Sequence, residues 1–163
     1  MFEQFMRNTL LLLMEDAVNE PATLMDVARI FTDDAFRKRK LARIKNVSVI
    51  DFWEKEAVKT TGDQGLANMT PYVTSKFTQF TANDYLRPII GQPKSAFNMR
   101  EVMDSGKILL VSLAKGKIGD LNAQLLGMIL TGRILMAALS RTDTPEQERR
   151  DFYFYIDEFH NFS

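Results

Sequence analysis

Two adjacent carboxylates near the end of the chain, Asp157 and Glu158, are the side chains whose types and spacing point most directly to chemistry. They follow residues 152–156, an aromatic and β-branched run that favours a strand buried on both faces. An apolar strand ending in Asp-Glu has the pattern of a Walker B motif. In that motif one carboxylate holds Mg²⁺ through water and the other polarises the water that attacks a nucleotide. The alternative is a core strand whose acidic residues open a polar loop.

The elements that must position this pair are a second strand and a long helix. Residues 107–113 are an apolar run of strand length, and residues 121 to about 140 are apolar nearly all round. Such a helix is either buried in a large assembly or spans a membrane, and Arg133 in its middle and the flanking strands favour burial. Strand, crossover helix and strand predict one right-handed βαβ unit of a parallel sheet.

A loop with two lysines, Lys115 and Lys117, precedes the long helix. Because the carboxyl ends of parallel strands meet at one edge, we expect this loop and the acidic pair to face the same crevice. The loop is not a P-loop, since the chain has no Gly-x₄-Gly-Lys-Ser/Thr sequence. A DNA-backbone contact, a subunit contact and a plain surface connection are its possible roles. A carboxylate pair without a phosphate cradle cannot hydrolyse ATP, so the chain alone is expected to be inactive.

Everything before residue 91 predicts a bundle of short helices. Thr23 is expected to cap one helix, residues 32–34 to cap the next, and Thr70 to cap a helix with Pro71 at its first position. Trp53 is expected to anchor the core rather than stack on a base. One helix is strongly basic, and its charges form either a solvated face or a contact with DNA or a partner; they are Arg37, Lys38, Arg39 and Lys40.

Composition excludes several classes of site and protein. The 163 residues carry 21 basic and 21 acidic side chains, so no net charge favours nucleic acid or membrane. The absence of cysteine excludes disulfides and thiolate metal sites, and a single histidine excludes histidine clusters. The apolar stretch 10–14 is far shorter than the ~20 residues of a spanning helix. The chain stops just after the acidic pair, which is typical of a piece of something longer.

Residues 24–37, 51–53, 106–119 and 155–162 together resemble the conjugative coupling proteins of type IV secretion and their TraG/TraD-like relatives. These belong to the FtsK/HerA group of hexameric, RecA-like DNA motors. The resemblance implies a partial P-loop NTPase fold that is mostly helical. Residues 1–91 would be an all-helical insertion domain, and residues 92–163 a partial RecA-like ATPase domain ending in Walker B.

The same resemblance implies the activity and partners of the parent protein. Asp157 would bind Mg²⁺ through water and Glu158 would orient the attacking water, with ATP and Mg²⁺ as cofactors that this chain alone does not hold. DNA would be the substrate, a hexameric ring the assembly, and secretion-system or relaxosome proteins further partners. The location would be cytoplasmic, at the inner face of the membrane through parts outside this chain. The missing Walker A and membrane anchor are departures from the family pattern.

Two other functions fit parts of the sequence. Residues 157–160 also match the Asp-Glu-x-His box of a superfamily 2 helicase, although the long helical region before them does not favour it. A non-enzymatic helical adaptor is the other alternative. In that case the basic helix over residues 36–45 would bind DNA or a partner, and the βαβ end would be scaffold.

Overall fold

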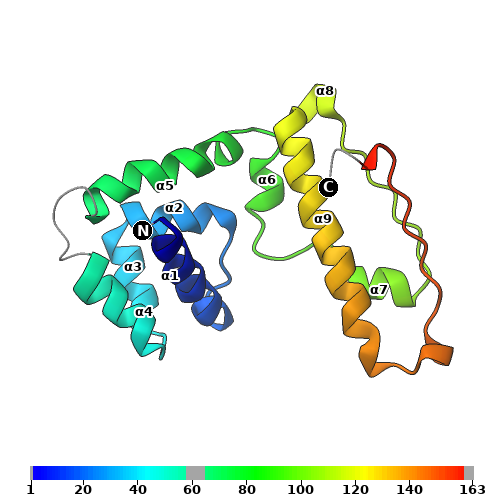
Figure 1. Cartoon of the computed structure of the whole chain (residues 1–163), viewed down its shortest axis with the longest axis horizontal. Helices are drawn as coiled ribbons and strands as arrows, with labels where there is room; N and C mark the ends of the chain where they lie inside the picture. Colours follow the sequence, from blue (N-terminus) through cyan, green and yellow to red (C-terminus); the bar gives the residue numbers. More distant parts are fainter. Residues whose placement is uncertain (1, 58–64, 160–163) are drawn as a thin grey trace. The chain divides into compact units, whose positions relative to one another are not determined.

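A computed structural model describes residues 2–57 and 65–159 of the chain (Figure 1). It divides into two compact units, Met1–Lys94 and Ser95–Ser163, called unit 1 and unit 2 below. Unit 1 is built from helices wherever the structure describes it. These are α1 (Phe2–Glu15), a 3₁₀ turn (Asp16–Val18), α2 (Leu24–Thr32), α3 (Asp34–Leu41), α4 (Val47–Asp51), a π-helix (Phe52–Ala57), α5 (Leu66–Thr81) and α6 (Arg87–Ile90).

The helix-start signals at Thr23 and within residues 32–34 are confirmed. Thr23 Oγ1 accepts a bond from a backbone N–H of the first turn of α2, and Asp26 Oδ2 accepts from the Thr23 N–H at 2.8 Å. This reciprocal pair is a capping box. Asp33 caps α3 by accepting from the Phe36 N–H at 2.9 Å, and this bond is the main reason that the pKa of Asp33 is lowered.

Trp53 lies at the centre of the unit 1 core, as predicted. Its side chain is buried, and its ring meets those of Phe5, Phe31 and Phe52 nearly edge to face, with centroids 5.3–6.0 Å apart. Aromatic pairs of this kind add about 0.5–1.5 kcal/mol beyond the burial of their area. Because the chain has one tryptophan, its fluorescence reports on the folding of unit 1.

The predicted start of α5 at Thr70 is wrong. The helix begins at Leu66, and Pro71 lies inside it, where the missing N–H removes a helical hydrogen bond. Thr70 caps nothing; its hydroxyl donates to the Leu66 carbonyl at 2.7 Å. Met69 and Val73, on either side of the proline, are buried, and α5 packs against α2. Tertiary packing therefore overrides the local start signal.

Unit 2 is organised along its longest helix. It contains α7 (Met99–Asp104), α8 (Lys115–Ile118), α9 (Asp120–Ser140) and two 3₁₀ turns (Arg141–Asp143 and Glu146–Glu148). The bounds of α9 agree with the helix predicted over residues 121–140, but no side chain caps its start, and its N-cap is Gly119 at φ 85°. The buried core is small and lies where α7 packs on α9. It consists of Met99, Met103 and Ala137, with Leu109, Leu130, Ile134 and Phe152 against them.

The predicted βαβ unit is wrong. Residues 107–114 and 151–156 are extended and run side by side past α9 in the same direction, but none of residues 2–57 and 65–159 is in a strand (Figure 1). The fold expected from the sequence, a helical bundle followed by part of a RecA-like parallel sheet, is therefore corrected to a helical one. No P-loop NTPase fold is present in the described part of the chain, so the fold gives no support to ATPase activity.

The reason is the lack of partners for the two extended segments. Among the described residues no backbone hydrogen bond joins them into a ladder. A single pair of strands is marginal in water, and a parallel pair is less stable than an antiparallel one. Their outward side chains have no covering layer, since Ile108, Leu110 and Tyr155 are 87–90% exposed. Strand propensity is present in the sequence, but the neighbours that would turn it into a sheet are not.

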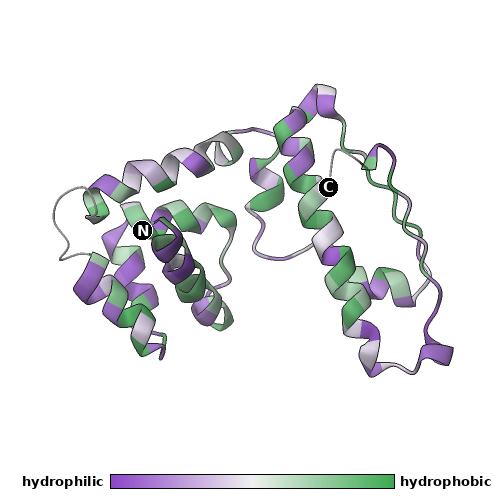
Figure 2. Cartoon of the chain, viewed as in Figure 1, coloured by the Kyte–Doolittle hydropathy of each residue, from purple (hydrophilic) through white to green (hydrophobic). Residues whose placement is uncertain are grey.

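Helix α9 is not buried, contrary to the expectation from Arg133 and the flanking segments. The stretch Asp120–Asp143 is long and apolar enough to cross a membrane by length and composition, and only 17% of its most apolar window is buried. Figure 2 shows its hydrophobic colouring along most of its length. Core helices of soluble proteins and signal sequences meet the same criteria, so the cytoplasmic location stays a prediction.

Arg100 on α7 ties that helix to the end of α9. Its guanidinium donates to the Ser140 carbonyl at 2.6 Å, to Asp104 at 2.6 Å and to Asp143 at 2.7 Å. The bond from Arg100 lowers the pKa of Asp143 below the ordinary 3.8 and, reciprocally, raises that of Arg100. At pH values above its ordinary pKa, the Asp143 carboxylate therefore stabilises unit 2. This stabilisation is lost as the pH falls through the lowered pKa.

We expect acid to weaken unit 2 through this pair. Trp53 fluorescence reports on unit 1, so a urea transition seen by circular dichroism but not by fluorescence reports on unit 2. The midpoint of that transition should drop as the pH falls from about 6 to about 3. Arg100→Met should start lower and lose less over the same range. Arg133→Met, at an exposed arginine with no ion pair to the described residues, serves as the control and should keep the wild-type dependence. Equal acid losses in all three proteins would contradict this assignment.

Candidate functional site

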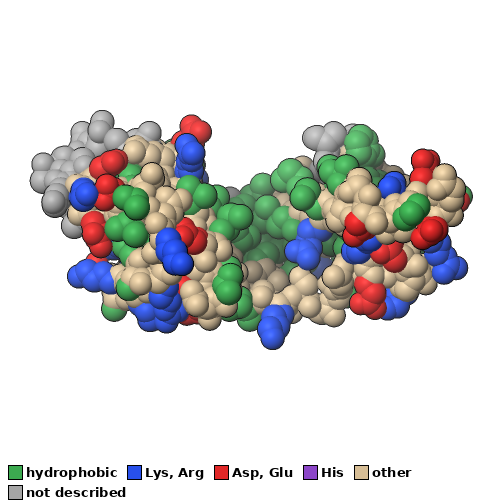
Figure 3. All heavy atoms as spheres, turned by 90° about the horizontal axis from the view of Figure 1, so that it is seen from below, with side chains coloured by type: hydrophobic (Ala, Val, Ile, Leu, Met, Phe, Trp, Pro, Cys, Tyr) green, Lys and Arg blue, Asp and Glu red, His purple; other side chains and the backbone are tan. Residues whose placement is uncertain are grey.

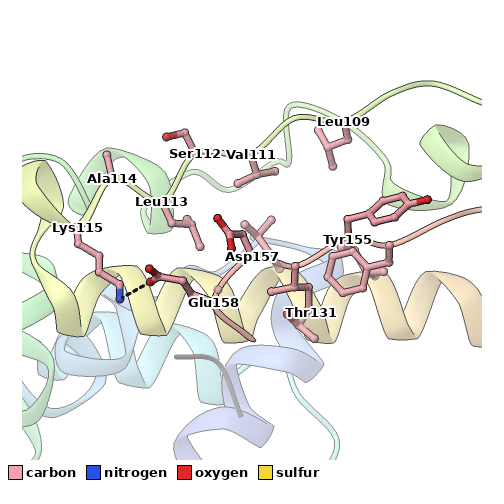
Figure 4. A pocket seen from close by; sticks show the side chains of 15 residues that line it. Leu109, Val111, Ser112, Leu113, Ala114, Lys115, Thr131, Tyr155, Asp157 and Glu158 are labelled. Carbon is pink, nitrogen blue, oxygen red and sulfur yellow. Dashed lines mark hydrogen bonds and ion pairs between the residues drawn. The ribbon is translucent and has the colours of Figure 1, made fainter. Parts of the chain in front are cut away.

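A cavity of about 520 Å³ lies in unit 2 between residues 109–115, residues 154–158 and the middle of α9 (Figure 4). Most of its wall is apolar and comes from both extended segments and from α9. Its polar lining comprises Ser112, Lys115, Thr131, Asp157 and Glu158. A mainly apolar cavity with a few convergent polar groups is the usual form of a small-ligand site.

The structure brings one predicted lysine to the predicted acidic pair. Lys115 Nζ lies 3.5 Å from Glu158 Oε2, and both side chains are partly exposed. Figure 4 shows Asp157 and Glu158 at the same end of the cavity as Lys115, whose ammonium points to Glu158. Lys115 and the acidic pair lie close together although no sheet is present, because the two extended segments run in the same direction and both end near α8 (Figure 1).

Lys117 lies apart from this cluster. It belongs to α8, is exposed, and forms no ion pair with the described residues. It does not line the cavity. The expectation that both lysines share a crevice with the carboxylates therefore holds for Lys115 and not for Lys117, which is left as a solvated surface charge.

The backbone at Glu158 is unusual. Its φ is 51°, and no other non-glycine residue in the described ranges has a positive φ. The left-handed region costs an L-residue about 1–2 kcal/mol. Strained residues of this kind cluster at functional sites, where the surrounding structure holds a side chain in a required direction. The carboxylate of Glu158 points to Lys115 (Figure 4).

The donor set at this end of the cavity fits Mg²⁺. That ion retains several waters and takes one or two protein carboxylates together with substrate phosphates. Asp157 and Glu158 are both exposed and supply two carboxylates. Among the residues that the structure describes, no group of three or more acidic, histidine or cysteine side chains forms a closed metal site. The pair therefore suits a metal that arrives with a phosphate ligand.

Two hydroxyls that line the cavity were missed by the sequence analysis. Ser112 and Thr131 belong to its lining, from the first extended segment and from α9. Thr131 shares one side of α9 with Gly127 and Ile134, which are four residues before it and three residues after it. The sequence signal for Thr131 was its hydroxyl on an otherwise apolar helix face.

The basic stretch of α3 is divided between the interior and the surface of unit 1. Arg37 is buried, donates to the Ile30 carbonyl at 2.8 Å and pairs with Asp34. Lys40 is 1% exposed and lies 2.7 Å from the carboxylate of Asp16, which is fully buried. These two cations hold unit 1 together and present no charge to DNA phosphates.

The other two cations of α3 are exposed and paired. Lys38 Nζ lies 2.7 Å from Asp34, and the hydrogen bond is the main reason that the pKa of Asp34 is lowered. Arg39 contacts Glu20 at 3.3 Å. Figure 3 shows basic and acidic side chains interspersed on the face in view. DNA contact by Lys38 and Arg39 stays a prediction. To bind a phosphate, Lys38 would have to leave Asp34 and Arg39 would have to leave Glu20.

No family model matches the chain, and neither a curated protein nor a solved structure does. The resemblance to coupling proteins therefore rests on the sequence motifs alone.

Proposed function

We propose that this chain supplies the acidic half of a magnesium–nucleotide site in a DNA-translocating motor ATPase of the conjugative coupling protein type. The observation that carries the proposal is the cluster of Asp157, Glu158 and Lys115 at one end of the apolar cavity. The proposal rests on this cluster and the sequence motifs, and not on a parallel sheet. The chain has no Walker A sequence, so the phosphate-binding loop comes from residues outside it.

Each side chain has a distinct role in this proposal. Asp157 would hold Mg²⁺ through water, and Glu158 would accept a hydrogen bond from the attacking water. Lys115 orients Glu158 through their 3.5 Å contact until a phosphate ligand competes for the lysine. Bound Mg²⁺ would supply charge neutralisation of the phosphate oxygens. The apolar walls of the cavity exclude water from the nucleotide and strengthen these interactions. The helical unit 1 engages DNA or accessory proteins.

Metal binding can be tested in the full-length protein with Mn²⁺ and ATP as the probes. We expect Mn²⁺ to broaden the NMR signals of Leu113 and Ile156 when ATP is present, and Asp157→Asn to weaken this binding by about tenfold or more. Asp151→Asn, at an exposed carboxylate at the other end of the same segment, should bind Mn²⁺ as the wild type does. Equal broadening in all three proteins would show that the acidic pair is not the metal site.

Catalysis has to be tested in the full-length protein. Glu158→Gln should retain ATP binding and lower DNA-stimulated ATP turnover by about 100-fold or more, because it removes the group that polarises water. The isolated chain should show no magnesium-dependent turnover. Unchanged turnover in Glu158→Gln would show that Glu158 does not polarise the attacking water, whereas a wild type without turnover whose function survives Glu158→Gln would favour a non-enzymatic adaptor. Turnover by the chain alone would contradict the assignment of the phosphate-binding loop to other residues.

A further inference from the structure

A groove of about 890 Å³ runs along another face of α9, between that helix and residues 95–101 of unit 2. It does not share the extended segments or the acidic pair with the candidate site. Phe97, Met128 and Met136 line it and are 47–67% exposed. Methionine adapts to irregular apolar partners, and grooves rich in it bind amphipathic helices.

One uncompensated charge lies in this groove. Arg133 is exposed, and no described residue forms an ion pair or a hydrogen bond with it. The other two charged residues of the lining are paired within unit 2. Arg100 bonds Asp104 and Asp143, and Glu101 lies 2.7 Å from Lys107. The groove therefore offers a single free positive charge among apolar side chains.

The floor of the groove is open at Gly132, which precedes this arginine. A Cβ built on Gly132 meets no heavy atom within 4 Å. The residues that α9 contributes are spaced so that they share one face of the helix: Met128, Ile129, Gly132, Arg133, Met136, Ala137 and Ser140. A second helix can approach closely at the glycine while its side chains pack against the methionines on either side.

We propose that this groove binds an amphipathic helix of a partner protein that carries one carboxylate among large apolar residues. The carboxylate pairs with Arg133, and the apolar residues, spaced i, i+3 and i+7, pack on Phe97, Met128 and Met136. The concave shape favours a helix over a bilayer, whose flat surface cannot enter a groove. The proposal is independent of nucleotide chemistry, because none of these residues belongs to the acidic cluster.

The test uses the whole chain with ¹³C-methyl methionine and three synthetic helices of about 18 residues. The helices share a Leu stripe at i, i+3, i+4 and i+7 and differ at one central position, which is Glu, Gln or Lys. We expect the Glu helix to shift the methyl signals of Met128 and Met136 and to leave that of Met14 in unit 1 unchanged. It should bind about tenfold more tightly than the Lys helix, since only it matches the charge of Arg133.

Two variants separate charge recognition from general apolar binding. Arg133→Glu should reverse the preference, so that the Lys helix binds more tightly. Gly132→Leu should abolish binding of all three helices by filling the floor, while its higher helix propensity keeps α9 folded. Lys117→Glu, a charge reversal at an exposed residue outside the groove, is the matched control and should keep the wild-type preference.

Several results would overturn the proposal. One is a Glu preference that survives Arg133→Glu, and another is a peptide-induced shift confined to methionines outside the groove. A concentration-dependent shift of Met128 and Met136 without peptide would make a second copy the occupant. Binding to phosphatidylcholine–phosphatidylglycerol vesicles that shifts the same signals and is not displaced by the Glu helix would make a lipid surface the occupant.

Discussion

Replacing Lys40 by methionine is expected to lower the free energy of unfolding of unit 1 by about 3–5 kcal/mol. The ammonium lies 2.7 Å from Asp16 Oδ2 and donates to the Glu20 carbonyl at 2.9 Å, and both charged side chains are at most 1% exposed. Asp16 Oδ2 accepts no hydrogen bond of good geometry, so the charge of Lys40 is the main group that offsets the burial of this carboxylate. Without that charge, the carboxylate stays buried and keeps, among the described residues, contacts with Asn19 and the more distant Arg43.

The measurement is urea unfolding followed by the fluorescence of Trp53. Arg39→Met is the control on the same helix, because Arg39 is 43% exposed and its pair with Glu20 is screened by water. It should cost less than about 1 kcal/mol. Adding Asp16→Leu to Lys40→Met should recover part of the loss, since the unpaired charge is then removed as well. A Lys40→Met variant as stable as the Arg39→Met control would show that the buried pair contributes nothing to the stability of unit 1.

Replacing Gly106 by alanine is expected to destabilise unit 2 by about 1–2 kcal/mol. Gly106 follows α7 at φ 65°, and its N–H donates to the Met103 carbonyl at 3.2 Å as the helix ends. An added Cβ would lie 2.4 Å from Cζ of Arg150, so the guanidinium must move away. That movement also breaks the bond from Arg150 to the Ser105 carbonyl.

Amide hydrogen exchange over α7 and α9 at one pH is the appropriate measurement, because it isolates unit 2 from unit 1. Gly116→Ala is the matched control. Gly116 lies in α8, and a Cβ there meets no atom within 4 Å. Alanine at this position should leave exchange unchanged or slow it slightly, given its higher helix propensity. A similar increase in the exchange rate in both variants would indicate that the left-handed conformation of Gly106 does not matter for the stability of unit 2.

The two ends of the chain differ in how well their sequence predicts their structure. The cap at Thr23, a cap within residues 32–34 and the buried Trp53 were all predicted from residues close in the sequence. The run before Asp157 was predicted to be a strand and is an extended segment without a ladder. Capping depends on neighbours within one turn, whereas a strand requires hydrogen-bonding partners that another segment must provide.

The candidate site shows the same division. Asp157, Glu158 and Lys115 were singled out from residue type and spacing, but the 3.5 Å contact of Lys115 with Glu158 and the exclusion of Lys117 required the path of the chain. The basic stretch of α3 is the clearest case. Helical spacing places Lys40 on the same side as the buried Phe36 and Ile44, but only the tertiary structure shows that Lys40 is buried against Asp16 while Lys38 is exposed.

By itself, the sequence determined where most helices form and which aromatic residue centres the unit 1 core, because hydrophobic periodicity and capping are properties of a few neighbouring residues. Only the tertiary structure decided that two cations of α3 are internal, that 107–114 and 151–156 form no sheet, and that α9 presents an open groove around Arg133. The physical reason is that burial, ladder formation and charge compensation depend on groups that lie far apart along the chain, such as Asp16 beside Lys40.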